Sequence, residues 1–165
     1  MAIKRNLVGL KFFCRHLGIT PSLSSITDRI LLQKIFYFLK KFDLELPYNF
    51  NFYKHGPYSP YLTDIYYQLD NYSEIVRDDS YTISEVERKK LDLAKDFLDL
   101  FKNDVDKLEY YASLLYIFTD LFFFKSAEGI DSARRNKIRT LKPHLFEKYG
   151  IDEPISKLRN FNLIS

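Results

Sequence analysis

Apolar residues recur at intervals of three and four along most of the chain, which is the spacing of helices with one buried face. Long runs of this kind cover residues 3–17, 28–42, 84–103 and 106–122. Shorter helices are expected after Ser59 and near the C-terminus, over residues 60–69, 130–139, 143–149 and 154–161. The pattern therefore predicts a mainly α fold of about six to eight helices.

The helix over residues 28–42 has an apolar stripe that includes Leu32 and Ile35. Lys34, Tyr37 and Lys41 fall together on another face, which we expect to be solvated. Thr27 or Asp28 is expected to cap the start of this helix.

One stretch follows a period of two instead. Tyr48, Phe50 and Phe52 alternate with other residues, which predicts a short, half-buried strand. Gly56-Pro57 is expected to end this strand, and Ser59 followed by Pro60 is typical of a helix start. The segment "KHGPYSP" is accordingly interpreted as a strand-to-helix turn.

Residues 73–84 are expected to supply a second short strand or two, with a hairpin bend at Asp78-Asp79 and with Ser84 capping the next helix. These elements together predict an α+β fold, with a compact helical body and a small antiparallel hairpin. A winged-helix-like element is compatible with this order. No repeat or long linker interrupts the pattern, so residues 1–165 are expected to form a single domain.

Composition supports a globular protein without a membrane span. Hydrophobic residues make up 46% of the chain and charged residues 28%. The longest apolar run, residues 110–124, is short for a span and contains Asp120. Cys14 is the only cysteine, so no intramolecular disulfide can form, and no signal-peptide pattern is present. We expect a cytoplasmic protein.

Motifs of common enzymes are missing from the sequence, including phosphate loops, paired cysteines and the Gly-x-Ser-x-Gly motif. Asp92, Asp96 and Asp99 share a helical face, but Lys95 and Lys102 lie close enough to pair with them. We therefore expect no catalytic residue, no metal site and no cofactor.

An aromatic partner-binding edge is the first functional hypothesis. The chain has 15 Phe and 13 Tyr, and tyrosines often lie at interfaces. The residues expected to contact a partner are Tyr53, His55, Tyr58, Lys34 and Tyr37. A purely structural role of His55 in the turn is the alternative.

A nucleic-acid interface is the second hypothesis. Its candidate residues are basic and fall on two predicted helices: Arg134, Arg135, Arg139, Lys142, Lys11 and Arg15. Arg135, Arg139 and Lys142 would share one helical face, as phosphate contacts require. However, the net charge is only +3 and the isoelectric point, near 8.8, is below that of a dedicated nucleic-acid binder.

Four segments resemble the prokaryotic YwgA-like and Panacea (SocA-like) families. They are "LLQKIFYFLKKF", "YNFNFYKHGPYSPYLTDIYYQLD", "KLEYYASLLYIF" and "RTLKPHLF", between residues 30 and 146. The families show a Leu-Gln-Lys helix, an aromatic strand ending in Gly-Pro-Tyr-Ser, a Leu-Glu-x-x-Ala-Ser helix and a later Lys-Pro.

The resemblance implies a mainly helical domain with a small hairpin. It also implies a non-enzymatic, protein-binding role of antitoxin or proteolytic-adaptor type, with a toxin or regulatory protein as partner. Homodimer formation through the aromatic residues is left open. The basic N-terminal helix and the segment "FFFKSAEGIDSARRNK" depart from the family pattern.

Overall fold

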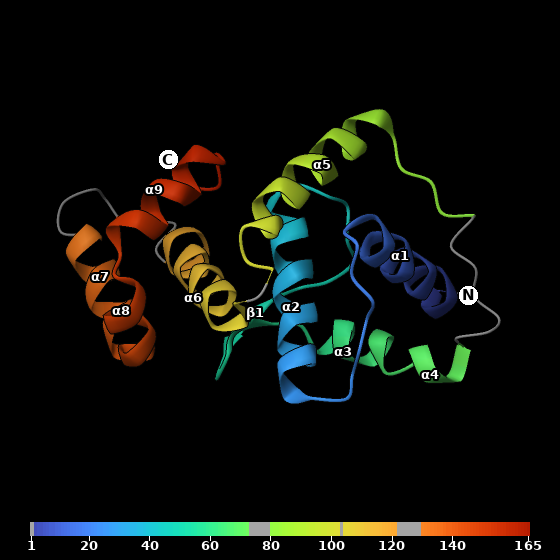
Figure 1. The fold of residues 1–165 in the computed structure, drawn as a ribbon, viewed down its shortest axis with the longest axis horizontal. Coiled ribbons are helices and arrows are strands. Elements are labelled where there is room, and N and C mark those ends of the chain that lie inside the picture. Colours follow the sequence, from blue (N-terminus) through green and yellow to red (C-terminus); the bar gives the residue numbers. More distant parts are fainter. Residues whose placement is uncertain (1, 73–79, 103, 122–129) are drawn as a thin grey trace.

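The computed structural model describes residues 2–72, 80–102, 104–121 and 130–165. The elements in chain order are α1 (Ala2–His16), α2 (Ile26–Lys41), β1 (Asn51–Tyr53), β2 (Gly56–Tyr58), α3 (Pro60–Tyr66), α4 (Leu69–Tyr72), α5 (Glu85–Asp99), α6 (Val105–Tyr116), the π-helical turn η1 (Ile117–Leu121), α7 (Ile130–Leu141), α8 (Pro143–Tyr149) and α9 (Asp152–Asn160). The protein is thus mainly helical with a small antiparallel hairpin, as predicted (Figure 1).

Helices α2 and α6 form the centre of the molecule. All residues from Leu32 to Leu39 in α2 are buried, and so are all residues from Leu108 to Leu115 in α6. In Figure 1, α1 lies toward one end of the long axis, and α7, α8 and α9 lie toward the other. Because α2 is buried around its whole circumference there, the predicted solvated face with Lys34 and Tyr37 is wrong.

The hairpin consists of β1 and β2, joined by the two-residue turn Lys54-His55. Its register pairs Asn51 with Tyr58 and Tyr53 with Gly56. The sequence-based prediction that Gly56-Pro57 ends the strand is therefore wrong. These residues begin the second strand, because Gly56 adopts the left-handed φ of 82° that lets the chain reverse there.

No strand is present in residues 80–84, the described part of the segment in which one or two further strands were expected. The rest of that expectation, including the bend at Asp78-Asp79, lies outside the described residues. Pro57 is tolerated in β2 because a two-stranded sheet leaves edge positions that need no backbone donor.

Serine caps set the start of three helices. Ser59 and Ser84 accept hydrogen bonds from the backbone amides of Leu62 and Glu87, as predicted from the sequence. Helix α2 instead begins after Ser25. Asp28 is the third helical residue and completes a capping box with that serine, so the predicted cap at Thr27 or Asp28 is wrong.

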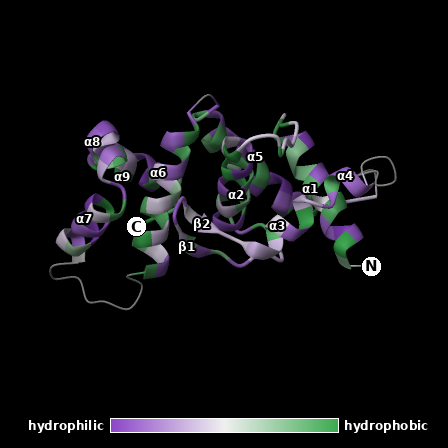
Figure 2. Ribbon diagram, turned by 90° about the horizontal axis from the view of Figure 1, so that it is seen from below, coloured by the Kyte–Doolittle hydropathy of each residue, from purple (hydrophilic) through white to green (hydrophobic). Residues whose placement is uncertain are grey.

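Aromatic rings fill the space between α2, α5 and the C-terminal segment. Phe97 of α5 is fully buried, and its ring contacts four others: Phe38, Phe42, Phe101 and Phe161. The end of the chain therefore returns to the core. By contrast, α7 and α8 carry mostly hydrophilic residues (Figure 2).

Candidate functional site at the hairpin

Six buried polar side chains lie together beneath the hairpin. They are Gln33 and Lys34 of α2, Ser59 before α3, Glu109 and Ser113 of α6, and Lys142 before α8. Apart from tyrosines, these are all the polar side chains that are buried in the described part of the chain. Buried polar groups need partners within the protein, and the bonds of this polar cluster fix the hairpin in place.

Gln33 holds the junction between β2 and α3. Its side-chain nitrogen donates to the Ser59 carbonyl at 3.1 Å and to the Thr63 hydroxyl at 2.9 Å. Its side-chain oxygen accepts a hydrogen bond from the Ser59 backbone amide at 2.9 Å. The amide of Gln33 therefore pairs with the backbone of Ser59 as a neighbouring strand would.

Lys34 reaches the hairpin from the next position of α2. Its Nζ donates to the Pro57 carbonyl at 2.6 Å, and the residue is only 1% exposed. Burial lowers the pKa of the Lys34 ammonium group from 10.5 to about 7, the carboxylate of Glu109 opposes this shift, and Lys142 adds to it. Near neutral pH, Lys34 is therefore only partly protonated.

Glu109 of α6 contacts His55 of the hairpin turn directly and reaches Lys54 through Lys142. One carboxylate oxygen pairs with Lys142 Nζ at 2.5 Å, and the other lies 3.3 Å from Nδ1 of His55. Lys142 also donates to the Lys54 carbonyl at 2.7 Å. The turn is consequently held by charged groups from two distant segments.

Gly56 lies against Ser113 of α6. A Cβ atom at position 56 would lie 2.5 Å from the Ser113 hydroxyl oxygen, which is closer than real Cβ contacts. The hydroxyl itself donates to the Glu109 carbonyl at 2.8 Å, within its own helix. Glycine is required here both by its positive φ and by this close approach.

A hollow of about 320 Å³ opens beside this turn. We call it the hairpin hollow. It lies between the hairpin, the first half of α2 and the end of α3, and the residues around it include Ile30, Lys34, Tyr53, His55, Tyr58 and Tyr67. Tyr53 is 49% exposed and Tyr67 is 50% exposed. Exposed aromatic rings therefore border a hollow whose base reaches the polar cluster.

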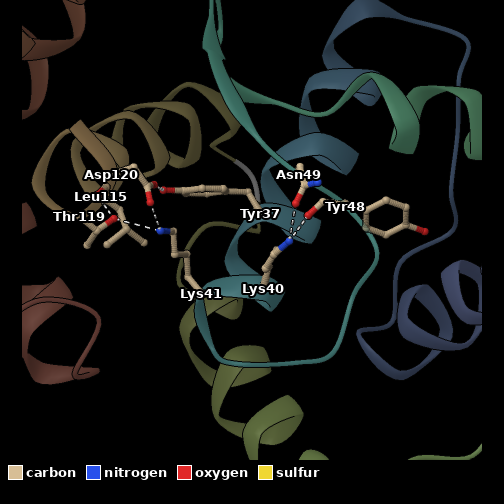
Figure 3. Close-up of polar contacts among 8 residues, drawn as sticks. All are labelled: Tyr37, Lys40, Lys41, Tyr48, Asn49, Leu115, Thr119 and Asp120. Carbon is tan, nitrogen blue, oxygen red and sulfur yellow. Dashed lines mark hydrogen bonds and ion pairs between the residues drawn. The ribbon is translucent and has the colours of Figure 1, made fainter. Parts of the chain in front are cut away.

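Four of the five residues predicted to contact a partner line the hairpin hollow: Lys34, Tyr53, His55 and Tyr58. Tyr37 does not line it. Its side chain is 1% exposed, and its hydroxyl donates to Asp120 of η1 at 3.2 Å (Figure 3). Burial and the neighbouring carboxylate raise the pKa of Tyr37 well above 10. Tyr37 thus joins two helical segments instead of facing a partner.

The contact between α2 and η1 also includes Lys41. Its Nζ lies 2.8 Å from Asp120 and 3.0 Å from the Thr119 hydroxyl (Figure 3). At the preceding position, Lys40 donates to the Tyr48 carbonyl and to the Asn49 side chain. Lys41 therefore connects α2 to η1, and Lys40 connects α2 to the segment before β1.

The basic residues predicted to bind nucleic acid do not form one surface. Lys142 is buried in its ion pair with Glu109, so the predicted face of Arg135, Arg139 and Lys142 is wrong. Arg135 pairs with Asp152 at 2.9 Å, and Arg139 lies over the Phe146 ring.

The remaining basic candidates lie apart from one another. Arg134 of α7 stacks on Phe118 and donates to its carbonyl oxygen. Lys11 and Arg15 belong to α1, toward the opposite end of the molecule (Figure 1). The two groups of basic residues therefore do not form one continuous surface patch.

Glu109, Gln33 and Ser113 were given no individual role by the sequence reasoning. Their signal was present, because each is a polar residue that lies next to apolar residues of a predicted helix. The structure also shows that the four segments on which the family resemblance rests meet at the polar cluster.

In comparisons with known proteins, no family model, curated protein or solved structure matches the chain. No helix in the described residues is long and apolar enough to cross a membrane. Within the same residues, no group of three or more His, Cys, Asp or Glu side chains is arranged to hold a metal ion.

Proposed function

We propose that the protein is a non-enzymatic protein-binding module of antitoxin or proteolytic-adaptor type in a prokaryotic defence or regulatory system. The observation that carries this proposal is the rigid support of an exposed aromatic hairpin by the buried polar cluster. Rigid aromatic side chains bind partners well because little conformational entropy is lost when they are covered. The antitoxin or adaptor class rests on the family resemblance.

The bonding of the polar cluster supports a binding role over a catalytic one. Both carboxylate oxygens of Glu109 are engaged, one with Lys142 and one with His55. Gln33 and Ser59 bond to each other through backbone and side chain. These groups hold a loop in one conformation, as a recognition surface requires.

Binding of nucleic acid has less support. Three of its candidate residues, Arg134, Arg135 and Arg139, contact neighbouring side chains of α7, α8, α9 and η1. Recovery of nucleic acid is therefore one possible result of the capture experiment.

The test is capture of a partner from a lysate of the native host, with and without nuclease. Wild-type protein is compared with Tyr53→Ala and Tyr67→Ala, which remove the exposed rings of the hairpin hollow. Tyr72→Ala is the matched control, because Tyr72 is also exposed but does not line the hollow.

We expect a stoichiometric protein that survives nuclease, is retained by Tyr72→Ala and is lost or strongly reduced with the two hollow variants. A partner captured equally by all variants would contradict a role of the hairpin. Recovery of nucleic acid alone would contradict the protein-binding proposal. Circular dichroism of each variant checks that the fold is intact.

A further inference from the structure

A second and larger hollow lies beside α1, and we call it the α1 hollow. Its lining residues come from α1, α2, α3 and the segments before β1 and α5, and include Asn6, Phe13, Phe36, Tyr48, Tyr61 and Tyr81. Its volume is about 1000 Å³, at the upper end of the range of ligand pockets. None of the described residues that line it also lines the hairpin hollow. A role of the α1 hollow therefore goes beyond the proposed binding of a partner at the hairpin.

Aromatic rings form much of the wall of the α1 hollow, and they contact one another in a series. The Phe36 ring lies between Phe13 and Tyr48, with centroid distances of 6.2 and 5.7 Å. Tyr48 contacts Tyr61 at 6.0 Å, and Tyr81 contacts Phe13 at 5.7 Å. The wall therefore offers ring faces and ring edges to an aromatic ligand.

The side of the hollow formed by Tyr81 depends on a glycine of α1. A Cβ atom at Gly9 would lie 3.0 Å from the Tyr81 ring, which is tighter than most real Cβ contacts. The absence of a side chain at Gly9 therefore lets Tyr81 pack directly on the backbone of α1 and close this side of the hollow.

The Tyr48 hydroxyl is a polar group of the hollow that has no hydrogen-bond partner in the described part of the chain. Tyr48 is only 1% exposed, and in Figure 3 its ring points away from Lys40 with the hydroxyl at the outer end. Burial and the nearby phenol groups of Tyr61 and Tyr81 raise the pKa of this hydroxyl. Buried hydroxyls normally have a hydrogen-bond partner. The unbonded hydroxyl therefore points to a ligand with a polar group at this position.

The other polar groups of the α1 hollow favour an uncharged ligand. Tyr61 accepts a hydrogen bond from Nδ2 of Asn6 at 2.8 Å, so its own proton is available to a ligand. Arg5 and Glu45 are the only charged residues among the described residues of the lining, and their charges are opposite. The lining therefore has no net charge to attract a charged ligand.

We propose that the α1 hollow binds a nucleoside, with the base against the aromatic rings and a group on the edge of the base bonded to the Tyr48 hydroxyl. Nucleobases stack on aromatic side chains, and they carry hydrogen-bond donors and acceptors on their edges. A purely apolar ring would leave the Tyr48 hydroxyl unbonded. A phosphate group would bring a charge that the lining does not balance.

The experiment is calorimetric titration of the full-length protein with adenosine, guanosine, cytidine and uridine. Ribose tests whether the base is required. The same base can also be supplied by a nucleotide or by an RNA strand, so adenosine monophosphate and a short single-stranded RNA test whether a phosphate contributes.

The decisive variant is Tyr48→Phe, which removes the hydroxyl and keeps the ring. It should unfold at the same temperature as wild type, because no described residue bonds that hydroxyl. Tyr110→Phe is the matched control. Tyr110 is also buried, but it does not line the hollow and its hydroxyl donates to the Gly150 carbonyl at 2.6 Å. If Tyr48→Phe does not fold, Tyr81→Phe at the half-buried edge of the hollow takes its place.

We expect at least one nucleoside to bind with a Kd below about 1 mM, and ribose not to bind. The nucleotide and the RNA should bind no more tightly than the nucleoside. Loss of one hydrogen bond should weaken binding about three- to tenfold in Tyr48→Phe. Tyr110→Phe should bind as wild type does, although its melting temperature is lower.

Failure of all four nucleosides to bind would overturn the inference, and so would equal affinity of the wild type and the folded hollow variant. Tighter binding of the nucleotide or the RNA would also overturn it, because a phosphate would then determine the affinity. The proposed function is tested separately by the capture experiment. If the hairpin captures a cellular protein but no nucleoside binds, the function stands and the nucleoside site does not.

Discussion

The hairpin and helix α7 both carry basic side chains, but the two regions use them differently. Beneath the hairpin, Lys34 and Lys142 are buried and bond to backbone carbonyls of the hairpin. On α7, Arg135 pairs with Asp152 at the surface, and Arg134 lies across an aromatic ring. The same residue chemistry therefore serves as an internal support in one region and as a local surface contact in the other.

This difference should determine how each region responds to substitution. A buried charge has lost its solvation by water. Removal of its partner therefore strongly lowers the free energy of unfolding. A charge at the surface is screened by water and salt, so removal of its partner changes the free energy of unfolding only slightly. We therefore expect substitutions in the buried polar cluster to cost more stability than substitutions on α7.

Glu109→Gln should cause the largest loss of stability. It removes the only carboxylate of the polar cluster and leaves Lys142 buried without its counter-ion. Breaking a buried ion pair by removal of one partner costs about 3 to 5 kcal/mol. Urea denaturation measures the loss, and Asp152→Asn, which breaks the exposed pair with Arg135, is the control. Equal, small losses in both variants would contradict the distinction between the two regions.

Gly56→Ala should rank second. The substitution places a methyl group 2.5 Å from the Ser113 hydroxyl and imposes a φ of 82° on alanine. Backbone strain and overpacking together should reduce the free energy of unfolding by about 2 to 4 kcal/mol.

Gly18→Ala separates the two causes of this loss. Gly18 follows α1 with a φ of 69°, but nothing lies within 4 Å of the point that a Cβ atom would occupy there. It should lose only the strain contribution, about 1 kcal/mol. If Gly56→Ala loses no more than Gly18→Ala, the close approach to α6 has no energetic role.

The local parts of this fold were predictable from the sequence. Ser59 and Ser84 cap helices as expected, because capping depends on neighbours within one turn. The second strand was not predictable from the sequence, because nothing local distinguishes a strand that begins at Gly56 from one that ends there. Gly56 lies against Ser113 of α6, which is more than 50 residues away in the sequence.

The candidate site was predictable only where its residues are close together in the sequence. Tyr53, His55 and Tyr58 are close in sequence and line the hollow together. Tyr37 and Lys142 were misplaced, because periodicity gives the face of a helix but not the number of neighbours that cover it. Lys142 follows Arg135 and Arg139 at helical spacing, so its pairing with Glu109 has no local signal.

The free energy of unfolding should depend on pH because of Lys34. Lys34 has a folded-state pKa of about 7 and an ordinary pKa of 10.5, so the unfolded chain binds more protons between these values. Stability therefore rises with pH through this window, and the contribution between about pH 7 and pH 9 is about 2 kcal/mol. Burial raises the pKa of Cys14 to about 12, which acts in the opposite direction at higher pH.

Denaturation of wild-type protein and Lys34→Met across pH 7 to 9 measures this contribution. The difference in the free energy of unfolding should change by about 2 kcal/mol over the range, and Arg135→Ala should show no such change. Parallel curves for wild type and Lys34→Met would contradict the low pKa.

Arg134 should show the smallest effect and tests whether α7 relies on charge or on packing. Its guanidinium group stacks on Phe118, yet its Nε atom is buried without a hydrogen-bond partner in the described residues. Arg134→Met keeps much of the apolar contact and removes the unbonded nitrogen, so it should change stability by less than about 0.5 kcal/mol. Arg134→Ala loses the contact and should cost about 1 kcal/mol. Thermal unfolding at low and high salt compares them, and a loss in Arg134→Met that disappears at high salt would show that charge holds this region as well.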